Sequence, residues 1–196
     1  QRYWGTPIPI VHCDHCGEVP VPYEDLPVEL PDDIRDYIPK GRSPLEDVDE
    51  WVNVPCPSCG GQARRDADTM DTFVDSSWYQ LRYCDNRNSE SIFDSALVNA
   101  WNPVDFYVGG IDHATGHLIY IRFFTKFLHD LGLVEFDEPA TELFNLGWVQ
   151  DENGLKMSKS RGNLVSPMQL MADHGVDNSR LAMFFQAPAE KDIPWS

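Results

Sequence analysis

The sequence predicts an α/β fold with a parallel sheet, together with a small insert that metal ligands rather than a large core would hold. Two observations lead to this prediction. A strand, a Gly-Gly pair and a helix follow one another over 104–130, which is half of a βαβ unit. Two Cys-x-x-Cys pairs stand in a proline-rich, acidic stretch. Hydrophobic residues make up 42% of the 196 residues, which is enough to form a core.

The insert lies near the start of the chain. Prolines exclude a helix from the first residues, so 1–12 reads as an extended segment that leads into the insert. The stretch 13–63 carries the cysteine pairs, many prolines and little periodicity, and we assign it to the insert. The α/β part follows at 64–150, and its first expected element is a helix around 76–84.

The strand, glycine and helix succession is the clearest part of the pattern. Residues 104–108 read as a strand, and Gly109-Gly110 reads as a tight turn. The helix expected over 112–130 has apolar residues at spacings of three and four, with its first residue as the N-cap. Gly132 is placed to end this helix.

The last third of the chain continues the same scheme. Residues 143–149 read as the next strand, which would complete a βαβ unit. The stretch 151–165 is polar, basic and contains glycine, so we expect a loop. A helical region follows at 166–196, with Pro167 in the first position of a helix that Gly175 ends.

Four of the five cysteines form the two Cys-x-x-Cys pairs, and a glycine follows the second cysteine of each pair. Four thiolates at the ends of two tight turns suit a structural Zn²⁺ ion and leave no position open for catalysis. Disulfides and a set that binds nothing are the alternatives, but no secretion signal supports disulfides. We predict a zinc site formed by Cys13, Cys16, Cys56 and Cys59. Cys84 reads as a small buried residue.

Two histidines follow the glycine pair at the spacing of one helical turn. His113 and His117 would lie on one helix face, near its positive end. Alone, they fit two ordinary, partly buried histidines equally well, and Ala114 stands where a zincin has glutamate. The glycines favour a site, because they let a ligand approach the backbone at the carboxyl end of a strand. Asp112 would accept hydrogen bonds from a ribose or only cap the helix.

A basic cluster stands out in this acidic chain. The 15 Lys and Arg against 32 Asp and Glu give a net charge of 15 − 32 = −17, so the chain as a whole should repel nucleic acid. Lys156, Lys159 and Arg161 nevertheless fall within six residues, with serine hydroxyls among them. Such a cluster suits a mobile loop that closes on a polyphosphate. The alternative is an ordinary solvated loop.

The charge and the start of the chain carry further expectations. Self-repulsion should destabilise the compact state, so we expect salt to stabilise it, which would fit a halophilic source. Basic partners or further domains that offset the charge are the alternative. The chain begins with Gln1 rather than Met and shows no signal-peptide pattern, so we expect a piece of a longer cytoplasmic protein. Its longest apolar runs are too short to span a bilayer.

Several motifs resemble one enzyme family. Residues 156–160 read Lys-Met-Ser-Lys-Ser, the KMSKS signature of class I aminoacyl-tRNA synthetases. Three further segments resemble the leucyl-tRNA synthetases in particular: 2–9, 71–79, and 108–113 with His117. The resemblance covers essentially the whole chain. It implies the second half of a Rossmann-like class I nucleotide-binding fold with a zinc-ribbon insert, in which 64–150 is the catalytic half and 151–165 the KMSKS loop.

The resemblance also implies a reaction and the residues that perform it. The reaction is ATP-dependent activation of leucine to leucyl-adenylate and transfer to tRNA(Leu), with Mg²⁺ accompanying ATP. The residues implied for the leucine side-chain pocket are Phe73, Ser76, Tyr79, His113 and His117. Those implied for ATP are Gly109, Gly110, Asp112, Met157, Ser158 and Ser160. Lys156 and Lys159 would stabilise the pyrophosphate by position and charge as the leucine carboxylate attacks the α-phosphorus.

Parts of the family pattern are absent from this chain. It lacks the HIGH signature and the first half of the nucleotide fold, and it has no editing domain or anticodon-binding region. We therefore expect it to be inactive alone and to need an N-terminal, HIGH-bearing half. One alternative is a non-catalytic paralogue that binds tRNA or another partner through the zinc knuckle, although the two retained lysines argue against it. An isoleucyl or valyl relative is the other.

Overall fold

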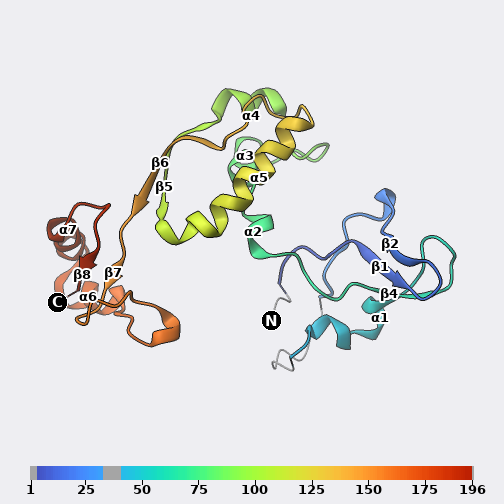
Figure 1. The fold of residues 1–196 in the computed structure, drawn as a ribbon, viewed down its shortest axis with the longest axis horizontal. Helices are drawn as coiled ribbons and strands as arrows, with labels where there is room; N and C mark the ends of the chain where they lie inside the picture. Colours follow the sequence, from blue (N-terminus) through green and yellow to red (C-terminus); the bar gives the residue numbers. More distant parts are fainter. Residues whose placement is uncertain (1–3, 33–40, 196) are drawn as a thin grey trace. The chain divides into compact units, whose positions relative to one another are not determined.

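The computed structural model describes residues 4–32 and 41–195, so Arg2 and Tyr3 of the family-like start lie outside the described residues. The chain divides into two compact units, residues 1–76 and 77–196 (Figure 1). Within the described ranges, every helix is too short or too polar to cross a membrane.

A small antiparallel sheet forms the frame of the first unit. Its strands lie in the order β2-β1-β4-β3: β1 (Ile10–Cys13), β2 (Gly17–Pro20), β3 (Asn53–Pro55) and β4 (Gln62–Arg65). The central strand β1 pairs Cys13 with Gly17 on one side and with Ala63 on the other. Three short helices lie between β2 and β3: η1 (Tyr23–Asp25), η2 (Pro44–Asp47) and α1 (Asp49–Val52); α2 (Thr72–Asp75) follows β4. The sheet therefore joins the two ends of the predicted insert.

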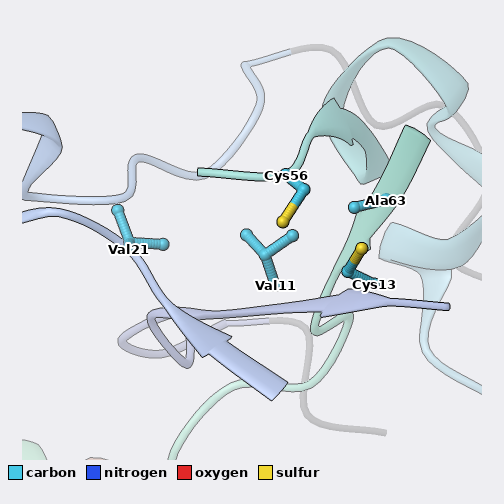
Figure 2. Packing of buried hydrophobic residues seen from close by; sticks show 5 residues of the cluster. All are labelled: Val11, Cys13, Val21, Cys56 and Ala63. Atoms are coloured by element: carbon cyan, nitrogen blue, oxygen red, sulfur yellow. The ribbon is translucent and has the colours of Figure 1, made fainter. Parts of the chain in front are cut away.

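The interior of this unit is small and rich in sulfur. Figure 2 shows its cluster of buried side chains: Val11, Cys13, Val21, Cys56 and Ala63. Leu45 and Val52 are also fully buried, at 0% and 1% exposure. Since the largest members of the cluster are valines, the apolar contribution to its stability is modest. Two of the five residues in the cluster are cysteines of the predicted metal site, so the metal site forms part of the core.

The second unit contains the predicted βαβ arrangement. Strand β5 (Val104–Gly110) runs parallel to β6 (Ala140–Leu146) and is connected to it through the 3-10 helix η3 (Ile111–Thr115) and helix α5 (His117–Asp130). Gly109 pairs with Asn145, and Gly110 pairs with Leu146. The tight turn predicted at the glycine pair is therefore wrong, because both glycines still belong to the β5–β6 ladder.

The helix predicted over 112–130 is interrupted near its start. The chain leaves helical geometry at Gly116, with φ −132° and ψ −108°, so η3 and α5 are separate elements. Asp112 is consequently not the N-cap of α5, and His113 and His117 do not share one α-helix face. The other end is as predicted: Gly132 has a φ of +72°, and its N–H donates to the His129 carbonyl over 2.8 Å.

The helix predicted over 76–84 is shorter than expected. Residues 76–78 separate α2 from α3 (Tyr79–Cys84), and α4 (Ser95–Trp101) follows. Helices α3, α4 and α5 contribute to the core of the second unit, whose buried residues are Leu81, Phe93, Val98, Leu128 and Val134. Cys84 packs against this core but is only partly buried, so its interpretation as a small buried residue is confirmed only in part.

The C-terminal part folds back on the segment that follows β6. Strand β7 (Val149–Gln150) pairs in parallel with β8 (Ile193–Pro194), and the elements between them are η4 (Lys159–Arg161), α6 (Pro167–His174) and α7 (Val176–Gln186). Pro167 and Gly175 stand at the ends of α6, as predicted. The predicted strand 143–149 is broken at Gly147, because its N–H donates to the Ala189 carbonyl over 3.0 Å. A Cβ at this glycine would collide with the Lys191 backbone.

Candidate functional site

The sulfur atoms of the four paired cysteines converge in the first unit. The ligand atoms of Cys13, Cys16, Cys56 and Cys59 all lie within 4.8 Å of one another, and the Sγ atoms of Cys13 and Cys59 are 3.8 Å apart. Zn–S bonds of about 2.3 Å at tetrahedral angles separate sulfurs by about 3.8 Å, whereas a disulfide requires about 2.05 Å. All four cysteines are free. Their donor set and spacing fit a structural zinc ion and not a pair of disulfides.

Two similar turns position these sulfurs. Gly17 and Gly60 follow the second cysteine of each pair and have φ values of +77° and +71°, a conformation that glycine adopts without strain. The N–H of Cys56 donates to the Gly61 carbonyl over 2.7 Å and fixes the second turn. Hydrogen bonds from the backbone of Cys59 and then of Ser58 lower the pKa of the Cys56 thiol to about 7. The second turn thus favours a thiolate at Cys56, whereas a hydrogen bond with the Cys59 side chain, followed by burial, raises the pKa of the Cys16 thiol to about 12.

A cavity of about 180 Å³ opens in the second unit, where β5 ends. Its lining includes four of the residues expected to bind leucine or ATP: Gly109, Gly110, His113 and His117. The two glycines leave open space beside the backbone of β5, so a ligand can approach it closely. The rings of His113 and His117 lie 5.8 Å apart and nearly perpendicular, at 85°. The cavity therefore combines an open stretch of backbone with two imidazoles.

Tyr107, which we did not predict, connects two of the predicted residues at this cavity. Its hydroxyl oxygen lies 2.7 Å from Tyr79 Oη and 2.6 Å from His117 Nε2. Burial raises the pKa of Tyr107, and the hydroxyl of Tyr79 adds to this effect. Burial lowers the pKa of His117, as does the neighbouring His113. Both Tyr107 and His117 are therefore uncharged near neutral pH, and this wall of the cavity is polar without net charge.

The alternation of side chains along a β-strand could have identified Tyr107 as a residue of this site. Residues two apart in a strand face the same side of the sheet, so Tyr107 shares a face of β5 with Gly109. The same reasoning that placed the glycine at a ligand site extends to the tyrosine.

The remaining two predicted pocket residues belong to the first unit. There, Ser76 Oγ donates to the Phe73 carbonyl over 3.5 Å, so both residues lie in one turn at α2. Their role in leucine binding stays a prediction.

A second cavity of about 560 Å³ lies beside the basic loop. It is lined by four residues predicted for ATP binding or catalysis: Gly110, Asp112, Lys156 and Met157. Lys156 Nζ forms an ion pair with the Asp112 carboxylate and lies 5.1 Å from the centroid of the Trp148 ring. Most of the remaining lining is apolar. An apolar wall with a carboxylate and a cation at its edge can accept the base, the ribose and the phosphates of a nucleotide.

The other predicted loop residues directly follow Met157 in the sequence. Ser158 Oγ and Ser160 Oγ lie 3.2 Å apart, and Lys159 begins the exposed turn η4. In the part of the chain that the structure describes, these three side chains are outside the cavity lining. Gly110 lines both this cavity and the smaller one at the end of β5. The two cavities therefore adjoin at the last residue of that strand.

Comparison with known proteins identifies the relatives of this chain. Residues 1–196 match the family of class I tRNA synthetases (I, L, M and V). The chain is 57% identical over 198 residues to a leucine–tRNA ligase of a Nocardioides species and 53% identical over 196 residues to that of Thermosipho melanesiensis; these matches cover 100% of the chain and 23% and 24% of the two relatives. A crystal structure of an Agrobacterium radiobacter K84 LeuRS–tRNA–LeuAMS ternary complex matches with a TM-score of 0.83 and 52% identity, over 100% of this chain and 25% of that one. The chain thus spans about a quarter of the length of these relatives.

Proposed function

We propose, from the premise that this chain belongs to the class I tRNA synthetases, that it is part of a leucine–tRNA ligase. The enzyme would activate leucine with ATP to leucyl-adenylate and transfer the leucyl group to tRNA(Leu). Two findings support the choice of amino acid: the similar curated proteins are leucine–tRNA ligases, and the similar crystal structure holds a LeuRS with tRNA and LeuAMS. The HIGH-bearing half and the anticodon-binding region would lie in the rest of a longer protein.

The observation that carries this proposal is the position of Gly110. An aminoacyl-adenylate joins an amino acid to a nucleotide through one phosphate, so it needs two adjoining sites. The cavity with the Tyr79–Tyr107–His117 hydrogen bonds and the cavity with Asp112 and Lys156 both reach Gly110. We assign the leucine side chain to the first and the adenosine to the second.

The residues of this chain would act mostly by position and charge. Gly109 and Gly110 let the adenylate approach the backbone, and Asp112 accepts hydrogen bonds from the ribose. Lys156, now paired with Asp112, would turn to the phosphates when the ribose takes its place. As the leucine carboxylate attacks the α-phosphorus, pyrophosphate leaves with its negative charge, which Lys156 and Lys159 stabilise. Met157, Ser158 and Ser160 complete the loop on the nucleotide.

Two metals belong to the proposal. Structural zinc would be held by the four converging cysteines, whose geometry fits it and whose thiols a reducing cytoplasm would keep free. Mg²⁺ would neutralise part of the charge on the ATP phosphates when it is bound.

The test is leucine-dependent exchange of pyrophosphate into ATP, measured with each of the amino acids. This chain joined to its N-terminal half should support exchange with leucine, whereas the 196-residue chain alone should not. Exchange with isoleucine or valine in preference to leucine would overturn the specificity. Activity of the chain alone would overturn the claim that it is half of an active site.

A further inference from the structure

Two side chains that the proposed chemistry does not use close the loop that carries the lysines. Asn163 Nδ2 donates to Asp151 Oδ2 over 2.8 Å, across twelve positions of sequence. Both side chains are partly buried. The KMSKS residues 156–160 lie between them, so this hydrogen bond forms the base of the loop.

Asp151 fixes the turn that leads to the first lysine. Its Oδ1 accepts the N–H groups of Asn153 and Leu155, each over 2.9 Å. Its own N–H donates to the Leu155 carbonyl over 2.8 Å. The side chain of Asn163, followed by the N–H of Leu155, lowers the pKa of Asp151, so the carboxylate is charged at neutral pH. Both of its oxygens are committed to the loop.

Asn163 holds the backbone within the signature itself. Its Oδ1 accepts the N–H of Ser158 over 2.9 Å, and its Nδ2 also donates to the Lys156 carbonyl over 3.3 Å. One amide therefore grips the chain on both sides of Met157. The orientation of this amide is determined by its partners, because Ser158 N–H needs an acceptor and the Asp151 carboxylate needs a donor.

We infer that Asp151 and Asn163 are positioning residues that hold the KMSKS loop with Lys156 at the nucleotide cavity. Neither side chain needs to touch the substrate, since they act through the backbone of 153–158. A bridge between Gln150 and Lys156 and the hydrogen bond from Met157 N–H to the Val149 carbonyl, over 3.0 Å, hold the same stretch on β7. The catalytic part of this inference rests on the proposed function.

The hydrogen-bond pattern allows a test by exchange of the two side chains. Asp151→Asn would set an NH₂ group against the NH₂ of Asn163, since its oxygen is still required by two backbone N–H groups. Asn163→Asp would set one carboxylate against another. In the double variant the new amide donates to the new carboxylate, whose second oxygen accepts the Ser158 N–H. The 3.3 Å hydrogen bond to the Lys156 carbonyl is lost, and a carboxylate oxygen then faces that carbonyl, which is why recovery should be incomplete.

The first measurement is leucine activation by the full-length enzyme. Each single variant should lower kcat about tenfold with little change in the KM for leucine, and the double variant should recover to within about threefold of wild type. Glu152→Gln is the matched control, because it removes a neighbouring exposed charge that takes no part in the network, and it should leave kcat unchanged. A loss that does not arise from the Asp151–Asn163 hydrogen bond would not be repaired by the second substitution.

The second measurement, amide hydrogen exchange, does not depend on activity. The amides of Asn153, Leu155 and Ser158 should exchange faster in both single variants and return toward the wild-type rate in the double variant. Unchanged exchange in the single variants would show that the network does not hold the loop. Faster exchange with unchanged kcat, or a double variant no better than the singles, would overturn the positioning role.

If the wild-type enzyme activates another amino acid, the proposed specificity fails while kcat for that amino acid still tests the loop. If it activates none, the proposed function and the catalytic part of this inference both fail, and exchange alone decides whether the network holds the loop.

Discussion

Four sulfur atoms organise the turns of the first unit, whereas a carboxylate and an amide organise the lysine-bearing loop of the second. The cysteines come from two segments and include two members of a buried core, so metal ligation by them would be coupled to the folding of that unit. Asp151 and Asn163 are only partly buried, and water can replace each of their hydrogen bonds. A closed metal set gives a rigid, all-or-none structure, and an exposed polar network gives a loop that can be ordered and still move.

The largest effect should come from removing the sulfur ligands. Cys13→Ser together with Cys56→Ser should reduce bound zinc from one ion per chain to none and unfold residues 10–65, because structural zinc is worth about 10–16 kcal/mol in comparable peptides. Elemental analysis and circular dichroism measure the two consequences. Cys84→Ser, which changes the cysteine of the second unit, should keep the zinc and the fold. Zinc that survives the double substitution would place the metal elsewhere.

The lysines of the loop should come next in size. Lys156→Ala and Lys159→Ala in the full-length enzyme should each lower kcat and kcat/KM for leucine activation by about 10²–10³, because they act on charge that grows in the transition state. Arg87→Ala removes an exposed cation outside the loop and serves as the control. Lysine variants that raised only the KM for leucine would reduce the loop to a binding element.

The pocket tyrosine should affect binding rather than turnover. Tyr79→Ala removes the ring and the hydrogen bond to Tyr107, so the KM for leucine should rise about tenfold and smaller amino acids should compete better. Tyr83→Ala is the matched control, since that ring is 74% exposed and contacts Tyr79 only edge-on. Equal changes in the two variants would show that Tyr79 acts through helix α3 and not through the pocket.

A smaller effect is expected from pH. The pKa of His117 is lowered from 6.5 by burial and by His113, so the unfolded chain takes up a proton at a pH at which the folded chain does not. The second unit should therefore lose stability as the pH falls below the unfolded pKa of 6.5. Urea unfolding of wild type, His117→Gln and the exposed control His174→Gln measures it. Only His117→Gln should flatten the dependence; the same slope in all three would assign it to other groups.

Salt should give the smallest and most diffuse effect. The net charge of −17 predicts that the melting temperature rises with KCl. Most of the rise should come below about 0.5 M, because the screening length is already near 3 Å at about 1 M. Differential scanning calorimetry over a KCl series measures it. A melting temperature that falls as KCl increases would contradict the self-repulsion argument.

Motifs that carry their own geometry were predictable from the sequence. Each Cys-x-x-Cys pair and the ends of α6 depend on residues a few positions apart, and the structure has them where the pattern placed them. The parallel pairing of β5 with β6 followed from the strand and helix order. Of the predicted site residues, Tyr79, His113 and His117 do lie together, as do Asp112 and Lys156.

The errors arose where a distant partner decides the local structure. Gly109 and Gly110 read as a turn, but β6 supplies ladder partners more than thirty residues later and keeps them extended. The strands of the first unit have three or four residues, and β2 and β3 end in proline, so each is too short for an alternating pattern to be detected. Nothing in the sequence indicated a role for Asn163. Its role depends on the groups that its amide hydrogen-bonds in the folded loop, and these cannot be predicted from residue spacing.

The contact at Gly147 has a consequence for recombination between homologues. Its N–H donates to the Ala189 carbonyl, and the absence of a side chain lets it rest against Lys191, so residues 147–191 begin and end at the same place. Such a segment can be exchanged as a cassette. A chimera with both crossovers at this contact keeps the hydrogen bonds of the loop, of α6 and of α7 within one parent, except the bond from Lys156 to Asp112. With a single crossover inside this segment, residue 147 and residues 189–191 would come from different parents. The close contact between them, which has no room for a Cβ at residue 147, would then no longer be matched.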